Sequence, residues 1–174
     1  MERIDLIKNW LDKLAYKKQP HFIGSWNIRN DDLCKQIINF FEENKILQKK
    51  GQVGNRVKET TKKTTDITIS PNDLKNDEFK CFNNYMDELH KCFIDYQLQW
   101  PFMKSLIKNV DIGSFNVQKY SKGDHFSKVH TERGILQHSD RLFAWMTYLN
   151  NVEDGGTTNF SHYDIKIKPE IGKT

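Results

Sequence analysis

The chain has 174 residues, of which 37% are hydrophobic and 12% aromatic, and its formal net charge is +4. This length and composition predict one globular domain with a buried core and exclude a disordered chain. No apolar run approaches the roughly 18 residues of a membrane span, and the charged first residues do not resemble a secretory signal. The three cysteines include no C-x-x-C pair. We therefore expect a cytoplasmic protein with neither a disulfide framework nor a membrane partner.

Two amphipathic helices are predicted in the first part of the chain. The first spans residues 30–45, with Asn30 or Asp31 as its N-cap and apolar residues recurring on one face. The second runs from about 77 to 97, and its apolar stripe comprises Phe79, Phe82, Tyr85, Met86, Leu89 and Phe93. A stripe with this spacing belongs to a hydrophobic core far more often than to a cofactor site.

A basic segment separates the two helices. Residues 49–63 hold six basic side chains and one acidic one, with no aromatic residue among them to stack on a base. This favours a solvated loop and speaks against a nucleic-acid partner. Residues 64–70 then alternate between polar and apolar side chains, which predicts a strand.

The last third of the chain has the pattern of short strands. Its runs SFNVQKY, RLFAWMTYL and DIKIK are rich in β-branched and aromatic residues and are separated by Gly, Asp and Asn. We expect residues 1–113 to form a helical part with one strand and residues 114–174 to form a β core. Together they predict a single α+β domain in which helices pack on an antiparallel sheet or sandwich.

Three histidines are followed two residues later by an acidic residue. They are His130 with Glu132, His138 with Asp140, and His162 with Asp164. In a strand, residues i and i+2 point to the same face, so each pair can present an imidazole and a carboxylate to one metal ion. With a further histidine, such a pair forms the 2-His-1-carboxylate site that binds Fe(II). Chance alone produces about one such pair in a chain of this composition, so the spacing does not choose among them.

The surrounding motifs distinguish the first pair. Tyr120, His130 and Glu132 form the pattern Y-x9-H-x-E, and Arg141 and the motifs YLN, GG-x-T-x-F and IKPEIG follow in order. Over about residues 114–173 this succession resembles the Fe(II)- and 2-oxoglutarate-dependent oxygenases of the prolyl 4-hydroxylase type. The H-x-E form and the upstream stretch FIGSWNI are similar to a phage and microbial branch of that family.

The resemblance implies a site and a reaction. His130 and Glu132 would bind the metal, because the family's metal pair precedes its arginine, YLN and GG-x-T elements. Tyr120 and Tyr148 would hydrogen-bond 2-oxoglutarate, and a phenol on a strand can donate to a carboxylate. Fe(II), 2-oxoglutarate and ascorbate are the expected cofactor, co-substrate and reductant. The implied reaction is hydroxylation of a C–H bond in a peptide or small molecule, with peptidyl proline as the family's default substrate.

The other two pairs receive different interpretations. His162 and Asp164 lie after GG-x-T and are expected in a hairpin, and His138 and Asp140 are expected in a loop. His125 is close enough in sequence to contact the metal ligands without binding the metal itself. The favoured interpretation, however, is an exposed loop histidine.

Two departures from the family pattern matter. Glu132 stands where most members have aspartate. The family's third metal ligand and its basic residue for 2-oxoglutarate come later than Thr174, so the resemblance implies a double-stranded β-helix, or jelly roll, that is incomplete at its C-terminus. From two of three ligands we expect weak Fe(II) binding and no measurable turnover.

Two alternatives remain open from the sequence. One is a non-catalytic binding domain that retains the jelly-roll fold with an incomplete metal site. The other is a structural zinc site of His125, His130 and Glu132, which lacks the usual Cys₄ or Cys₂His₂ spacing.

Overall fold

A computed structural model describes residues 21–174 except for 108–109, 135 and 137–138. Its helices are α2 (Asp31–Glu43), α3 (Lys80–Gln99) and α4 (Phe102–Leu106), with short 3₁₀ turns at Lys45–Leu47, Asp73–Lys75 and Asp77–Phe79. Its strands are β1 (Lys49–Lys50), β2 (Lys62–Lys63), β3 (Thr65–Ile69), β4 (Phe115–Lys119), β5 (His125–Phe126), β6 (Thr158–Phe160) and β7 (Ile165–Ile167). The fold is mixed α+β with small antiparallel sheets.

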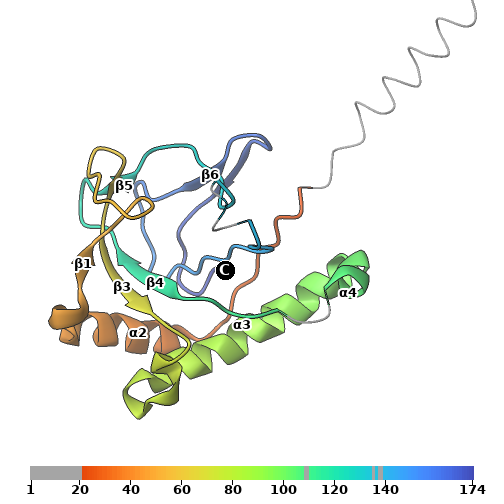
Figure 1. The fold of residues 1–174 in the computed structure, drawn as a ribbon, viewed down its shortest axis with the longest axis horizontal. Coiled ribbons are helices and arrows are strands. Elements are labelled where there is room, and N and C mark those ends of the chain that lie inside the picture. The colour runs from red at the N-terminus through yellow and green to blue at the C-terminus, as the bar shows by residue number, and fades with distance from the viewer. Residues whose placement is uncertain (1–20, 108–109, 135, 137–138) are drawn as a thin grey trace, which may run out of the picture.

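The main sheet has the strand order β1-β3-β4 and packs against the helices. Ile67 pairs with Val117 and Ile69 with Phe115 across the β3–β4 register. Both isoleucines are buried in one cluster with α2 and α3, and Phe115 and Val117 pack against it. Because alternate strand residues point to opposite faces, the other face of this sheet carries the polar side chains. Figure 1 shows α2 and α3 on one side of the sheet and the C-terminal segments on the other.

Local sequence explains where α2 begins. The side-chain oxygen of Asn30 accepts a hydrogen bond from the amide of Leu33, at 3.1 Å. Asp31 and Asp32 occupy the first turn, where negative charge is favoured by the helix dipole. The predicted helix and its asparagine cap are confirmed.

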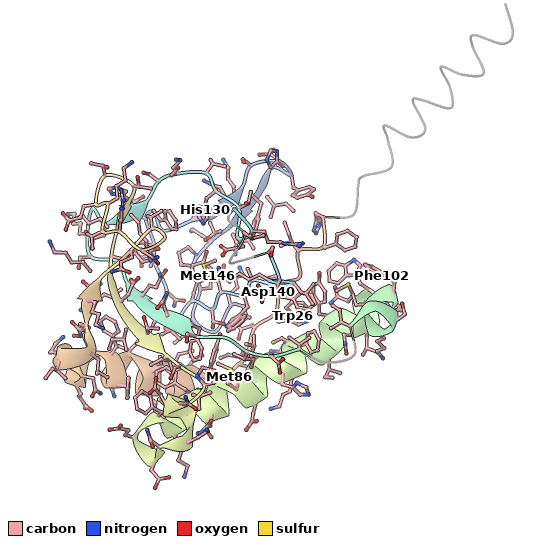
Figure 2. The ribbon with its side chains drawn as sticks, in the orientation of Figure 1. Trp26, Met86, Phe102, His130, Asp140 and Met146 are labelled. Atoms are coloured by element: carbon pink, nitrogen blue, oxygen red, sulfur yellow. The ribbon has the colours of Figure 1, made fainter. Side chains whose placement is uncertain are left out.

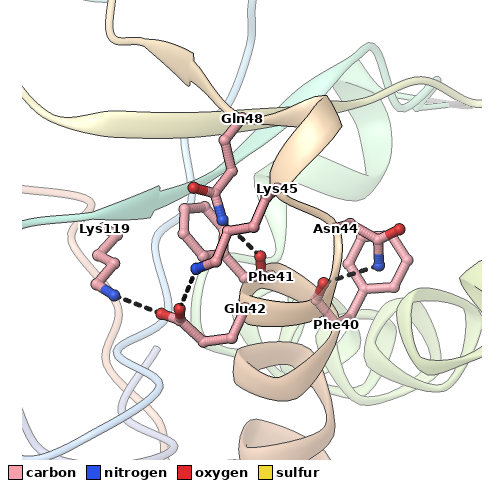
Figure 3. Close-up of polar contacts among 7 residues, drawn as sticks. All are labelled: Phe40, Phe41, Glu42, Asn44, Lys45, Gln48 and Lys119. Carbon is pink, nitrogen blue, oxygen red and sulfur yellow. Dashed lines mark hydrogen bonds and ion pairs between the residues drawn. The ribbon is translucent and has the colours of Figure 1, made fainter.

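Side chains also terminate α2 (Figure 3). The amide groups of Asn44 and Gln48 donate to the carbonyls of Phe40 and Phe41, at 2.8 and 2.7 Å, which satisfies two of the free carbonyls at the helix end. Glu42 pairs there with both Lys45 and Lys119. Lys119 belongs to β4, so this ion pair joins the helix to the sheet.

We predict that Asn30→Ala lowers the free energy of unfolding by about 1 kcal/mol, because the Leu33 amide loses its capping acceptor. The matched control is Asn39→Ala, at an exposed position within the same helix. Alanine has the higher helix propensity, so this control should be neutral or slightly stabilising. Urea unfolding of both variants measures the difference, and equal losses would contradict the capping role.

Backbone pairing around the C-terminal end differs from the sequence-based expectation. Residues 141–149 were predicted as a strand but are not assigned to one. The amide of Tyr148 donates to the carbonyl of Lys173 at 2.9 Å, and the amide of Gly172 donates to the carbonyl of Tyr148 at 2.8 Å. On the other side of the C-terminal residues, the amide of Trp26 donates to the carbonyl of Thr174 at 2.8 Å. These few bonds hold the C-terminal residues between Tyr148 and Trp26 without forming a continuous ladder.

The first 113 residues contain three described strands rather than the one expected. Strands β1 and β2 have two lysines each, and their partners β3 and β5 are distant along the chain. Runs this short carry no readable alternation, so only tertiary pairing defines them. Among the described residues, no helix is both long and apolar enough to span a membrane.

Candidate functional site

The face of the sheet turned away from the helices carries two hydrogen-bonded groups of polar side chains. We call Asp66, Thr68, Asn116, Gln118 and Tyr120 the polar face; they come from β3, β4 and the residue after β4. The carboxylate oxygen Oδ2 of Asp66 accepts from the ammonium of Lys62 at 2.7 Å and from Nε2 of Gln118 at 3.2 Å. The side chains on β4 are exposed, whereas Asp66 is buried. The polar face is therefore open along β4 and at Thr68, and closed at Asp66.

Tyr120 ends the group that contains Asp66 and Gln118. Its hydroxyl donates to Oε1 of Gln118 at 3.3 Å. Although 47% of the residue's surface is exposed, desolvation of the phenol raises its pKa to about 12, and the charges of Asp66 and Tyr148 add to this. The hydroxyl therefore keeps its proton at neutral pH and remains a hydrogen-bond donor.

Tyr148, the second predicted 2-oxoglutarate ligand, has its hydroxyl engaged by the β6–β7 hairpin. The phenol oxygen lies 2.6 Å from the hydroxyl of Thr158 and donates to the carbonyl of Ile167 at 3.3 Å. Either hydroxyl can donate in the shorter bond, because Thr158 also has the sulfur of Met146 as an acceptor at 3.7 Å. Binding a carboxylate through Tyr148 would require its proton to leave Thr158 or Ile167.

His130 and Glu132 lie side by side, but on a loop. They were predicted on one strand, and this is wrong: both fall in the turn-containing segment that follows β5. Their side chains are 44% and 49% exposed, and Nε2 of His130 lies 3.7 Å from Oε1 of Glu132. Figure 2 places His130 on the opposite side of the sheet from Met86 in α3.

Neighbouring groups fix the orientation of both side chains. Nδ1 of His130 lies 2.9 Å from the carbonyl of Lys128; because a carbonyl only accepts, Nδ1 carries a proton, and in the neutral ring the lone pair is on Nε2. The His130 ring stacks on Phe126, with centroids 4.2 Å apart and an interplanar angle of 16°. Arg141 donates to Oε2 of Glu132 at 3.2 Å, which leaves Oε1 facing the histidine.

His130 and Glu132 supply two of the three protein ligands of the predicted iron site. Metal-bound histidines generally donate their second ring N–H to a carbonyl or carboxylate, as His130 does to Lys128. A free imidazole nitrogen beside a carboxylate oxygen suits Fe(II). Within the described ranges, however, no group of three His, Cys, Asp or Glu side chains is placed to hold a metal. This also counts against the zinc site of His125, His130 and Glu132.

The candidate site has two halves, the polar face with Tyr120 and the pair His130–Glu132. An aromatic contact joins them. The ammonium of Lys62 lies 5.8 Å from the ring centroid of Phe126, which in turn stacks on His130. In the part of the chain that the structure describes, no hydrogen bond or ion pair links His130 or Glu132 to Tyr120 or Tyr148. The structure thus brings His130 and Glu132 together in one half and Tyr120 and its partners in the other, and Phe126 lies between Lys62 and His130.

The remaining histidines lie elsewhere. His162 and Asp164 are exposed in the turn between β6 and β7, which confirms the hairpin prediction. His125 lies in β5 opposite Lys63 and is half-buried, so the favoured interpretation as an exposed loop residue was wrong. Asp140 is exposed in a turn, and His138 lies outside the described residues.

Sequence reasoning missed Lys62, Asp66 and Gln118. The basic run was interpreted as a solvated loop, yet Lys62 is only 4% exposed. The available signal was alternation: Asp66 lies in the middle of a predicted strand, at a position that faces away from Ile67 and Ile69. A charged residue there requires a partner, and Lys62 is the basic residue four positions earlier.

Comparisons with protein families, with curated proteins and with solved structures gave no match. The function is therefore inferred from this chain's own residues and their geometry.

Proposed function

We propose that the chain is a domain of an Fe(II)- and 2-oxoglutarate-dependent oxygenase of the prolyl 4-hydroxylase type. Its reaction would be hydroxylation of a C–H bond, with peptidyl proline as the default substrate class. The observation that carries the proposal is the pairing of Nε2 of His130 with Oε1 of Glu132 at 3.7 Å, with the other nitrogen of the ring held by the Lys128 carbonyl.

His130 and Glu132 would hold the iron. The stack on Phe126 and the bond to Lys128 keep the imidazole from turning, and Arg141 keeps Oε1 of Glu132 directed at the metal position. When bound, Fe(II) would activate O2, which would take two electrons from 2-oxoglutarate, giving succinate and CO2, and two from the C–H bond that becomes hydroxylated. The protein's part is to orient these groups and the substrate.

Tyr120 would bind a carboxylate of 2-oxoglutarate. Its hydroxyl is protonated at neutral pH and lies on the open part of the polar face, and the residue directly follows a paired strand. The fold proposal rests on the position of the C-terminal segments, which lie across the polar side of the β1-β3-β4 sheet, where a jelly roll has its second sheet.

A second candidate function is a non-catalytic binding domain with the same fold. It is favoured by the donor count, because the described residues supply two metal donors rather than three. It is also favoured by Tyr148, whose hydroxyl is already bonded to Thr158 and Ile167.

Metal and co-substrate binding test the proposal. Mn²⁺, a redox-stable probe for Fe(II), is titrated into the chain by electron paramagnetic resonance, with and without 2-oxoglutarate. We expect 2-oxoglutarate to tighten Mn²⁺ binding. His130→Ala and Glu132→Ala should each weaken it by at least about 10–100-fold, since the loss of a ligand costs no less than the loss of a supporting contact. Tyr120→Phe should weaken only the effect of 2-oxoglutarate, by about 10–150-fold.

The matched controls are His162→Ala and Asp164→Ala, which remove a histidine–carboxylate pair of the same spacing from the hairpin. Loss of Mn²⁺ binding in these controls, with retention in His130→Ala, would refute the assignment. Activity is measured with the longest version of the chain that its gene encodes, as the succinate formed from 2-oxoglutarate in air with Fe(II) and ascorbate. If that protein binds 2-oxoglutarate tightly but forms no succinate, the binding-domain alternative is supported.

A further inference from the structure

A buried ion pair lies directly beneath the open part of the polar face. Lys62 and Asp66 are 4% and 7% exposed, and their charged atoms are 2.7 Å apart. The backbone of Gly51 covers them so closely that a Cβ added there would meet Oγ1 of Thr64 at 1.9 Å and Oδ2 of Asp66 at 3.2 Å. The pair is therefore excluded from solvent, and its two side chains are held in one conformation.

This pair determines which way the amide of Gln118 points. The Asp66 carboxylate only accepts hydrogen bonds, so the group of Gln118 that faces it must be the NH₂, at 3.2 Å. The amide oxygen then faces the opposite way, and it accepts from the Tyr120 hydroxyl at 3.3 Å. A continuous path of hydrogen bonds therefore runs from Lys62 through Asp66 and Gln118 to Tyr120.

We propose that Lys62, Asp66 and Gln118 are positioning residues that hold the Tyr120 hydroxyl ready for the carboxylate of 2-oxoglutarate. The inference deepens the proposed function and rests on it. Gln118 contacts Tyr120 through its carboxamide. The ion pair of Lys62 and Asp66 acts on Tyr120 through Gln118.

Charge explains why the ion pair is needed. An unpaired Asp66 near the binding position would repel an incoming carboxylate, and Lys62 neutralises it. When the co-substrate arrives, the Tyr120 hydroxyl exchanges the neutral oxygen of Gln118 for a charged carboxylate, which is the stronger acceptor. Until then Gln118 keeps the half-exposed phenol over the polar face.

The test removes Gln118 and compares two backgrounds. Gln118→Leu should weaken 2-oxoglutarate binding to the Mn²⁺-loaded chain by about 5–10-fold, and Mn²⁺ binding without 2-oxoglutarate should not change. In a Tyr120→Phe background the same substitution should have no further effect, because the hydroxyl it positions is gone. A merely structural role of Gln118 would weaken binding in both backgrounds.

Asn116→Leu is the matched control. Asn116 lies on the same strand and face, but its amide oxygen bonds the hydroxyl of Thr68 at 2.7 Å and takes no part in the path. This variant should bind 2-oxoglutarate like the wild type. A loss equal to that of Gln118→Leu would overturn the proposal.

A ligand-free measurement separates this inference from the proposed function. In protein labelled with ¹³C at tyrosine Cζ, Gln118→Leu should shift the Tyr120 resonance, and Asn116→Leu should leave it in place. If the resonance shifts but no variant changes 2-oxoglutarate binding, the hydrogen-bonded path exists and the co-substrate role of Tyr120 is wrong. If Tyr120→Phe weakens binding but Gln118→Leu changes neither the affinity nor the resonance, the positioning role alone is refuted.

Discussion

Replacing Lys62 by methionine is expected to lower the free energy of unfolding by about 3–5 kcal/mol. The substitution leaves the buried carboxylate of Asp66 with only the amide of Gln118 as a partner. The other oxygen of Asp66, Oδ1, is buried and has no hydrogen-bond partner among the described residues. An unpaired buried charge is one of the few changes that costs this much. Urea unfolding followed by circular dichroism measures the loss.

Lys50 provides the control. Its side chain is 73% exposed, that of its partner Glu59 is 47% exposed, and their charged atoms are 2.7 Å apart. Lys50→Met should therefore cost no more than about 1 kcal/mol. The double variant Lys62→Met/Asp66→Leu removes both buried charges and should regain most of the stability lost in Lys62→Met. Equal effects of the two lysine substitutions would contradict the burial of Lys62.

Phe82→Ala is expected to destabilise the fold by about 3–5 kcal/mol, because it opens a cavity between the helices and the sheet. Phe82 is 1% exposed. Its ring packs edge-on against Phe40 of α2, with centroids 5.0 Å apart, and against Phe115 of β4, at 6.0 Å. One side chain of α3 therefore contacts both of the elements that it must hold together.

Phe102→Ala is the matched control for this substitution. Phe102 lies in α4 and is 46% exposed. Its removal leaves no enclosed cavity, so the expected cost is within about 1 kcal/mol. Thermal unfolding of the two variants compares them directly, and a similar loss in both would mean that Phe82 does not join the layers.

The two halves of the candidate site are supported in different ways. Tyr120 follows a strand with a full register to β3, above a buried ion pair. His130 and Glu132 lie in a loop, oriented by one carbonyl, one ring stack and one arginine. We therefore expect substitutions at Phe126 to affect metal binding and substitutions at Gln118 to affect co-substrate binding, each with little effect on the other half.

The sequence by itself determined the elements whose signals are local. Helix α2 follows from the cap at Asn30 and an apolar face with helical spacing, and β3 follows from its alternation. Gly155 and Gly156, adjacent glycines of the kind that favours a turn with positive φ, have φ values of 82° and 66°. The order of the motifs also singled out His130 and Glu132, whose side chains the structure places together. Apart from the motif order, which extends over residues 120–172, each of these signals depends on residues within a few positions of one another, so it can be interpreted without the fold.

Tertiary structure alone decided the rest. Lys62 belongs to a basic run that predicts solvent exposure, and it is buried only because Asp66 lies beneath Gly51, a residue from another strand connection. The pairing of Tyr148 with the C-terminal residues and the two-residue strands β1 and β2 depend on segments distant along the chain. Lys62 and His130 contact residues close to them in sequence, but they lie in and after strands β2 and β5, which pair with each other across a long separation. In these cases the energy of a paired charge or backbone group outweighs the local preference.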